Sequence, residues 1–110
     1  MSSGCGHDAS ELTVRVCCDP PLRHATVAAF TARALAVQLE RLLAARFSTC
    51  SRLTVTATGR EERILTREWR HDKPFTVDAV SELVREQLVE WLATDVELHA
   101  VSLEPGTVTP

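Results

Sequence analysis

The feature that most constrains the fold is a pattern that occurs twice along the chain. In both copies a strand-like stretch ends at an Asp-x-Pro corner, first at Asp19 and again at Asp72, and a Thr-Val pair then opens an amphipathic helical pattern. Each helical pattern carries a Gln-Leu-x-x-x-Leu-Ala run, from Gln38 and from Gln87, before another strand-like stretch. Two strand-helix-strand units in series predict an α+β fold with two similar halves.

Apolar periodicity places the elements of this fold. A period of two predicts strands near residues 12–18, 53–58, 63–70 and 96–103, and a helical period predicts helices that end near residues 47 and 93. The order βαββαβ with right-handed crossovers predicts a ferredoxin-like sandwich, in which a four-stranded antiparallel sheet carries two helices on one face. In this arrangement the first and third strands are expected to be central, and the threonine-rich second strand is expected at an edge.

Capping and turn residues set the expected boundaries. Asp19 is expected to cap the first helix, which should begin between residues 20 and 25, and Thr76 is expected to cap the second. Gly59 is expected in a hairpin turn where it takes a positive φ. We expect one domain with short ends, divided as a flexible N-terminal segment over residues 1–10, the α+β domain over 11–104 and a C-terminal tail over 105–110.

Composition and charge exclude several classes of protein. The chain has 110 residues and 45% hydrophobic content, enough for one domain to bury a core without metal or disulfide support. Its formal net charge of -3 argues against a protein that works by coating nucleic acid. No apolar run approaches the roughly 20 residues that cross a bilayer, and the N-terminus lacks a signal or transit pattern. We therefore expect no membrane association, a cytoplasmic or nuclear location, and reduced cysteines.

The sequence nominates no catalytic residue and no cofactor or metal site. The loop after the first strand holds Pro20 and Pro21, which lack the backbone donors that would cradle a phosphate as in acylphosphatases. No Ser-His-Asp or Cys-His arrangement can be assigned from the spacing. The histidines are scattered along the chain, at His7, His24, His71 and His99. We expect a protein that is not an enzyme.

The first helix differs from the second in having two apolar stripes. One stripe has the spacing of a core face and comprises Ala28, Ala32, Leu35, Leu39 and Leu42. The other lies roughly opposite and comprises Val27, Phe30, Ala34 and Val37. An uncovered apolar stripe on a helix marks association, so the sequence predicts a small protein-protein interaction module, either a homodimer or a subunit of a larger intracellular complex, with this second stripe as its partner interface.

Two alternatives use other residues. An RNA-binding domain of this topology would use the open face of its sheet, and the expected contacts are Arg15, Arg67, Trp69 and Arg70, although the glycine and aromatic pattern of RNA-recognition motifs is missing. A thiol or metal-binding protein would use the adjacent Cys17 and Cys18, completed by residues such as Cys5, His7 and His24.

Overall fold

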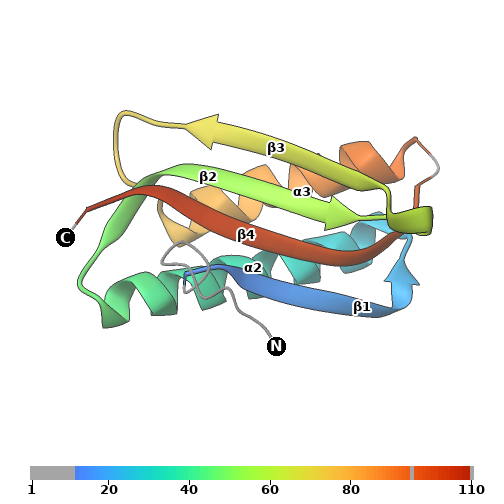
Figure 1. Ribbon diagram of the computed structural model, residues 1–110, viewed down its shortest axis with the longest axis horizontal. Helices are drawn as coiled ribbons and strands as arrows, with labels where there is room; N and C mark the ends of the chain where they lie inside the picture. The colour runs from blue at the N-terminus through green and yellow to red at the C-terminus, as the bar shows by residue number, and fades with distance from the viewer. Residues whose placement is uncertain (1–11, 95, 110) are drawn as a thin grey trace.

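The chain folds into four strands and two α-helices in the predicted order. The computed structural model describes residues 12–94 and 96–109. The elements are β1 (Val14–Leu22), α2 (Ala25–Ala45), β2 (Thr49–Thr58), a short 3-10 turn η1 (Arg60–Glu62), β3 (Ile64–Arg70), α3 (Val77–Leu92) and β4 (Leu98–Thr109). All strand pairs are antiparallel, and both helices cover the same face of the sheet (Figure 1). The predicted βαββαβ sandwich is confirmed.

The order of the strands differs from the prediction. The sheet runs β1-β4-β2-β3, so β4 and β2 are central, and β1 and β3 form the edges (Figure 1). The expected central positions of the first and third strands are therefore wrong, as is the edge position of β2. The longest strands, β2 and β4, form the middle ladder from Thr49↔Thr109 to Thr58↔Ala100. β1 contains Pro20 and Pro21, and proline suits an edge strand because it has no N–H to donate and an edge has one side without a neighbouring strand.

The first corner and the C-terminal end of the domain also depart from the prediction. Asp19 does not cap α2: it lies within β1, where a cis peptide joins it to Pro20, and the residue before the helix is His24, whose side chain makes no capping bond. The expected tail from residue 105 is the C-terminal part of β4, since residues 105–109 pair with β2. Pro105 is tolerated there because the ladder between β4 and β1 stops at Leu103↔Val14. The expected flexible segment over residues 1–10 lies outside the described residues.

The two turns around β3 and α3 are close to the expectation. Gly59 closes the hairpin, because its N–H donates to the carbonyl oxygen of Arg63 over 2.7 Å. The positive φ values of this turn fall on Glu61 and Glu62 rather than on Gly59. Thr76 caps α3 as predicted, since its hydroxyl oxygen accepts a hydrogen bond from the N–H of Ala79 over 3.1 Å.

The core lies between the sheet and the two helices. Leucine side chains from four elements fill it and are almost fully buried: Leu35, Leu39, Leu53, Leu88, Leu98 and Leu103. The core side of α2 follows the predicted stripe except at its end, where Leu43 is buried and Leu42 is half-buried. Among the described residues, no helix is long and apolar enough to span a membrane. The buried core leaves the outer side of α2 and the edges of the sheet available for contacts.

Candidate interaction surface

The predicted second stripe of α2 lies on the outer side of that helix. Phe30 is 73% exposed and Val27 is 48% exposed. Ala34 is exposed, and Val37 is half-buried. The structure therefore brings the four predicted residues together along one side of α2, opposite a side whose alanines and leucines are buried. Contact of this stripe with a partner stays a prediction.

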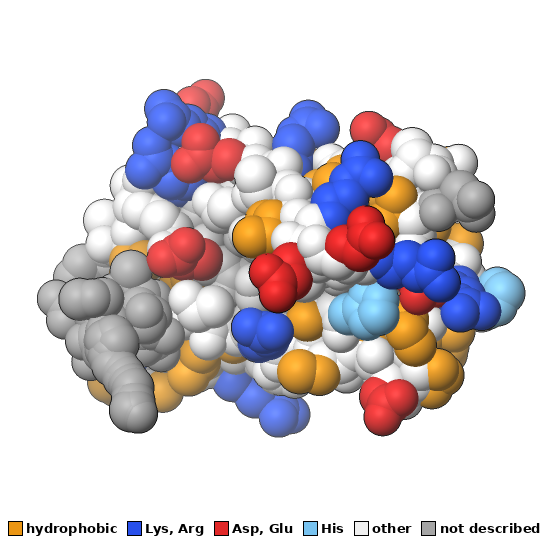
Figure 2. All heavy atoms as spheres, turned by 45° about the vertical axis from the view of Figure 1, so that its right-hand side comes forward, with side chains coloured by type: hydrophobic (Ala, Val, Ile, Leu, Met, Phe, Trp, Pro, Cys, Tyr) orange, Lys and Arg blue, Asp and Glu red, His pale blue; other side chains and the backbone are white. Residues whose placement is uncertain are grey.

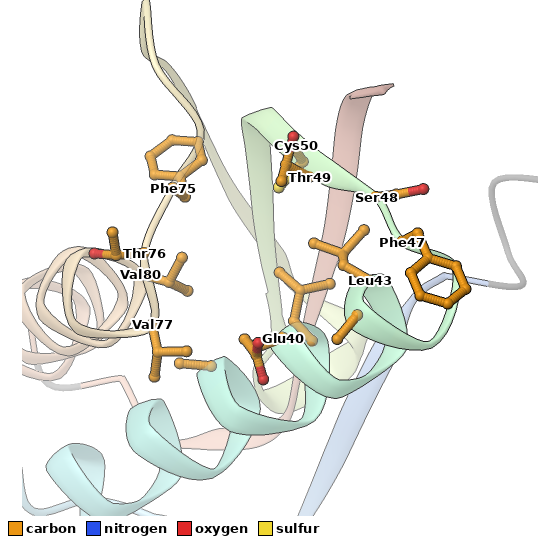
Figure 3. A pocket seen from close by; sticks show the side chains of 13 residues that line it. Glu40, Leu43, Phe47, Ser48, Thr49, Cys50, Phe75, Thr76, Val77 and Val80 are labelled. Atoms are coloured by element: carbon orange, nitrogen blue, oxygen red, sulfur yellow. The ribbon is translucent and has the colours of Figure 1, made fainter. Parts of the chain in front are cut away.

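A second apolar feature of α2 is a groove at its C-terminal end. The cavity has a volume of about 320 Å³ and lies between the end of α2, the start of β2 and the first turn of α3. Figure 3 shows Phe75 on one side of the cavity and Phe47 on the other, with Val77 and Val80 of α3 between the helices. Of the side chains that line it, one, Glu40, carries a charge. This groove was not predicted from the sequence.

Phe47 is exposed because of the way α2 ends. Its φ of 53° is left-handed, its N–H donates to Ala44, and the N–H of Ser48 donates to the carbonyl oxygen of Leu43 over 2.8 Å. These two bonds form a Schellman motif, in which the left-handed position is usually glycine. Phe47 is 87% exposed. The sequence carries one signal of this exposed ring: where the helical period ends, it has phenylalanine in place of the glycine or asparagine that usually takes a left-handed position.

Replacing Phe47 by glycine is expected to raise the free energy of unfolding by about 1 kcal/mol, because a left-handed backbone costs a residue with a Cβ about 1–2 kcal/mol. Little burial is lost, since the side chain is 87% exposed. Urea unfolding of both proteins measures the change. The control is Ala45→Gly in the last helical turn, where the backbone is helical and glycine is expected to destabilise by about 1 kcal/mol. A loss of stability in Phe47→Gly would show that packing of the ring in the groove outweighs the backbone strain.

The cysteines do not converge on a common site. Cys17 is exposed and Cys18 is half-buried, as expected for neighbours that point to opposite faces of a strand. Burial, and then the neighbouring Cys17, raise the pKa of Cys18, and burial raises the pKa of Cys50 at the groove. Within residues 12–94 and 96–109, no three His, Cys, Asp or Glu side chains are placed to hold a metal ion. Cys5 and His7 lie outside these residues.

A cluster of charges joins the β1-α2 loop, the β2-β3 turn and the start of β4. The carboxylate of Glu97 accepts hydrogen bonds from Arg23 Nε over 2.9 Å and from Arg60 Nε over 3.2 Å, and His99 Nε2 lies 3.5 Å away. Partial desolvation works against ionisation, but the two guanidinium groups outweigh it and lower the pKa of Glu97. The cluster links three segments that are far apart in the sequence.

This lowered pKa predicts a dependence of stability on pH. An acid with a lowered pKa in the folded state adds stability above its unfolded pKa, and this stability is lost as the pH falls through the folded pKa. Wild-type protein is therefore expected to melt at a higher temperature than Glu97→Gln at about pH 6, and the difference should shrink as the pH falls below 4.5, the ordinary pKa of a glutamate. Thermal melts across this range measure it. The difference in melting temperature is expected to be small, because most members of the cluster are exposed. A difference that stays constant across the pH range would contradict the prediction.

The four residues predicted to contact nucleic acid do not share a face. Arg15 lies on the open face of the sheet, opposite Ser102, and Arg70 lies on the same face. Trp69 packs against the core on the helix side. Arg67 is also on the helix side, where its Nη1 donates to Gln87 Oε1 over 3.2 Å and its guanidinium carbon lies 5.8 Å from the centre of the Trp69 ring. Side chains alternate along a strand, so residues 67 and 70 cannot share one platform.

The open face of the sheet carries both signs of charge. Arg52 Nε lies 2.9 Å from Glu68 Oε2 in an ionic contact whose geometry does not meet that of a hydrogen bond, and Arg70 Nη2 lies 3.7 Å from Glu68 Oε1. Glu104 is exposed on the neighbouring strand, opposite Thr54. Figure 2 shows acidic and basic side chains next to one another on the visible face, with no single basic patch.

The fold is that of the little finger domain of DNA polymerases. The chain is similar to the little finger domain in the complex of beta-clamp processivity factor and little finger domain of PolIV, with a TM-score of 0.71 and 16% identity over 90% of this chain and 89% of that chain. It is also similar to the Y-family DNA polymerase chimera Dbh-Dpo4(243-245)-Dbh, with a TM-score of 0.74 and 13% identity over 87% of this chain. The match to DinB from Sulfolobus solfataricus has a TM-score of 0.72 and 14% identity over 84% of this chain.

The extent of these matches limits what they establish. The chain spans 28% of the length of the polymerase chimera and 27% of that of DinB, and so corresponds to one part of those enzymes. No protein family model matches the chain, and no curated protein sequence is similar to it. TM-scores of 0.71 to 0.74 establish a shared fold, although the sequence identities are only 13% to 16%. Fold alone does not determine function, which has to be argued from the surfaces of this chain.

Proposed function

We propose that this protein is a non-catalytic docking module that binds a protein partner through the outer side of α2. The observation that carries the proposal is the exposure of Phe30 and Val27, at 73% and 48%, on a helix whose opposite side is buried. Apolar patches of this kind mark interaction sites, and exposed aromatic side chains are typical centres of binding energy. The proposal includes the cytoplasmic or nuclear location expected from the sequence.

The partner to test first is a beta-clamp processivity factor. The PolIV little finger domain, which has the same fold over nearly its whole length, is in complex with a beta-clamp processivity factor. We extend this partner class to the present chain as part of the proposal. A second copy of the chain is the other partner that an apolar helix side fits.

The experiment measures binding of the full chain to an immobilised beta-clamp processivity factor by surface plasmon resonance, and self-association by sedimentation. Phe30→Glu is expected to weaken binding about thirtyfold, the effect of losing about 2 kcal/mol at an interface hot spot. Glu86→Lys, a charge change on the exposed part of α3, is the control and should leave binding unchanged. A wild-type protein that sediments as a monomer and does not bind the clamp would contradict the proposal.

DNA binding through the open face of the sheet is the second candidate. It is favoured by the position of Arg15, Arg52 and Arg70 on that face. The same fold also occurs in the insertion ternary complex of Dbh DNA polymerase. It ranks second because Glu68 and Glu104 lie on the same face.

This second candidate predicts an affinity for duplex DNA that falls steeply with salt, since contacts to phosphate release counterions. Arg70→Ala should weaken binding, whereas Arg85→Ala, on α3 in the helix layer, should not. Fluorescence anisotropy with a labelled duplex measures both. Absence of binding at low salt would remove this candidate.

A further inference from the structure

The outer edge of β3 is a row of backbone groups without a neighbouring strand. Within the described residues, β3 pairs with β2 on one side and with no strand on the other. Its seven residues include no proline and no glycine. The opposite edge, β1, is interrupted by Pro20 and Pro21 and by a break in register between Cys17 and Leu22. An uninterrupted edge accepts an added strand, whereas prolines block one, so β3 is the edge suited to strand addition.

Two hydrogen bonds fix which groups of β3 point outward. The N–H of Gly59 donates to Arg63 over 2.7 Å, and the N–H of His71 donates to Ser51 over 2.8 Å. Hydrogen-bonded positions recur at every second residue of an antiparallel pair, so the odd-numbered residues of β3 direct their N–H and C=O groups toward β2. The groups that point to the free edge are those of the even-numbered residues, Ile64, Thr66, Glu68 and Arg70.

The odd-numbered side chains give this edge a chemical preference. Leu65 and Trp69 are half-buried on the helix side, and Arg67 lies between them and is exposed. The hydrogen-bond partner of Arg67 is the amide of Gln87, and among the described residues no carboxylate forms an ion pair with it. The edge therefore presents one cation flanked by two apolar side chains.

We propose that the free edge of β3 binds an extended peptide as an added antiparallel strand, with a carboxylate of the peptide opposite Arg67 and apolar residues opposite Leu65 and Trp69. At these three positions the added strand forms non-hydrogen-bonded pairs, in which side chains lie closest to each other. The peptide is of the pattern apolar-x-acidic-x-apolar. This surface is separate from the outer side of α2, so the two proposals are tested independently.

The first test uses the full chain and the capped heptapeptide Thr-Val-Thr-Glu-Thr-Val-Thr, with binding measured by titration calorimetry. When the peptide is aligned with its Glu opposite Arg67, its third and fifth residues direct their N–H groups to β3. Its second and sixth residues direct theirs to solvent. N-methylation of the third and fifth residues is expected to weaken binding more than about tenfold, because each methyl group removes a donor of the ladder. N-methylation of the second and sixth residues should change the affinity less than about twofold. Equal losses in both peptides would overturn the proposal.

The second test exchanges charges. Arg67→Glu should weaken the Glu peptide about tenfold and strengthen a peptide with Lys at its centre, because opposite charges across a strand pair attract and like charges repel. The control is Arg41→Glu on the exposed part of α2, which should change neither affinity. If Arg67→Glu does not fold, the methylated peptides decide the question. No binding at peptide concentrations up to about 1 mM would overturn the proposal and indicate an empty edge. A dimer of the wild-type chain that dissociates in Arg67→Glu would also overturn it and indicate that a second copy occupies the edge.

Discussion

Leu53→Ala is expected to lower the free energy of unfolding by about 3 kcal/mol, the middle of the range for a buried leucine. Leu53 is fully buried at the centre of the sheet, where its Cα partners are Trp69 on β3 and Pro105 on β4. The shortened side chain leaves a cavity. The strands on both sides of β2 are held by their ladders, so they cannot move in to fill it. In a domain of this size the melting temperature should fall by about 4–8 °C for each kcal/mol. Urea unfolding and thermal melts measure the two quantities.

Thr54→Ala is the control for this substitution. Thr54 is the next residue of β2 and lies on the open face, opposite Glu68 and Glu104. Its loss removes strand propensity but no core packing, and the cost should stay below about 1 kcal/mol. A loss of less than about 1 kcal/mol in Leu53→Ala as well would contradict the position of the core between β2 and the helices.

The class of fold was predictable because it depends on local patterns, and the strand order was not because it depends on distant pairing. The period of two in Thr54–Thr58 and the turn at Gly59 predict the β2-β3 hairpin without knowledge of the rest of the chain. The position of β4 between β1 and β2 depends on partners that are far apart in the chain, from Thr58↔Ala100 in the β2-β4 ladder to Val14↔Leu103 in the β1-β4 ladder. Two strand-helix-strand crossovers are compatible with either central pair of strands, so the periodic pattern could not distinguish them.

Proline at the first corner illustrates a second limit. An Asp-Pro-Pro segment is compatible both with the start of a helix and with an extended edge strand. In the structure residues 19–21 continue β1, and α2 begins after His24. The second corner behaved as predicted because Thr76 offers a side chain that caps a helix, whereas the first corner depends on the edge position of β1, which is a tertiary property.

The candidate surfaces were predicted to different degrees, because some depend on local periodicity and others on tertiary packing. The stripe of Val27, Phe30, Ala34 and Val37 follows from the helical period, and the structure places it on the outer side of α2. The groove beside Phe47 could not be predicted, because it depends on how far the end of α2 lies from the start of α3. The free edge of β3 depends in turn on the strand order.

Ala32→Leu is expected to lower the free energy of unfolding by about 2 kcal/mol, because the added side chain overpacks a closed contact. Ala32 is fully buried on α2 between Ala28 and Ala36. These small side chains allow α2 to lie close to its neighbours, and α3 is the element with which α2 makes the most contact. Urea unfolding measures the loss. A leucine at this position also pushes the helix layer apart, so the groove beside Phe47 should change shape.

The matched control is Ala34→Leu, the same substitution two residues further along the same helix but on its exposed side. Leucine and alanine have similar helix propensities, and a surface substitution is expected to change stability by less than about 0.5 kcal/mol. The added apolar surface beside Phe30 should strengthen binding of the partner proposed for α2, because burial of extra apolar area favours association. Equal losses of stability in the two variants would show that α2 does not have one packed side and one free side, which is the asymmetry on which the proposed function depends.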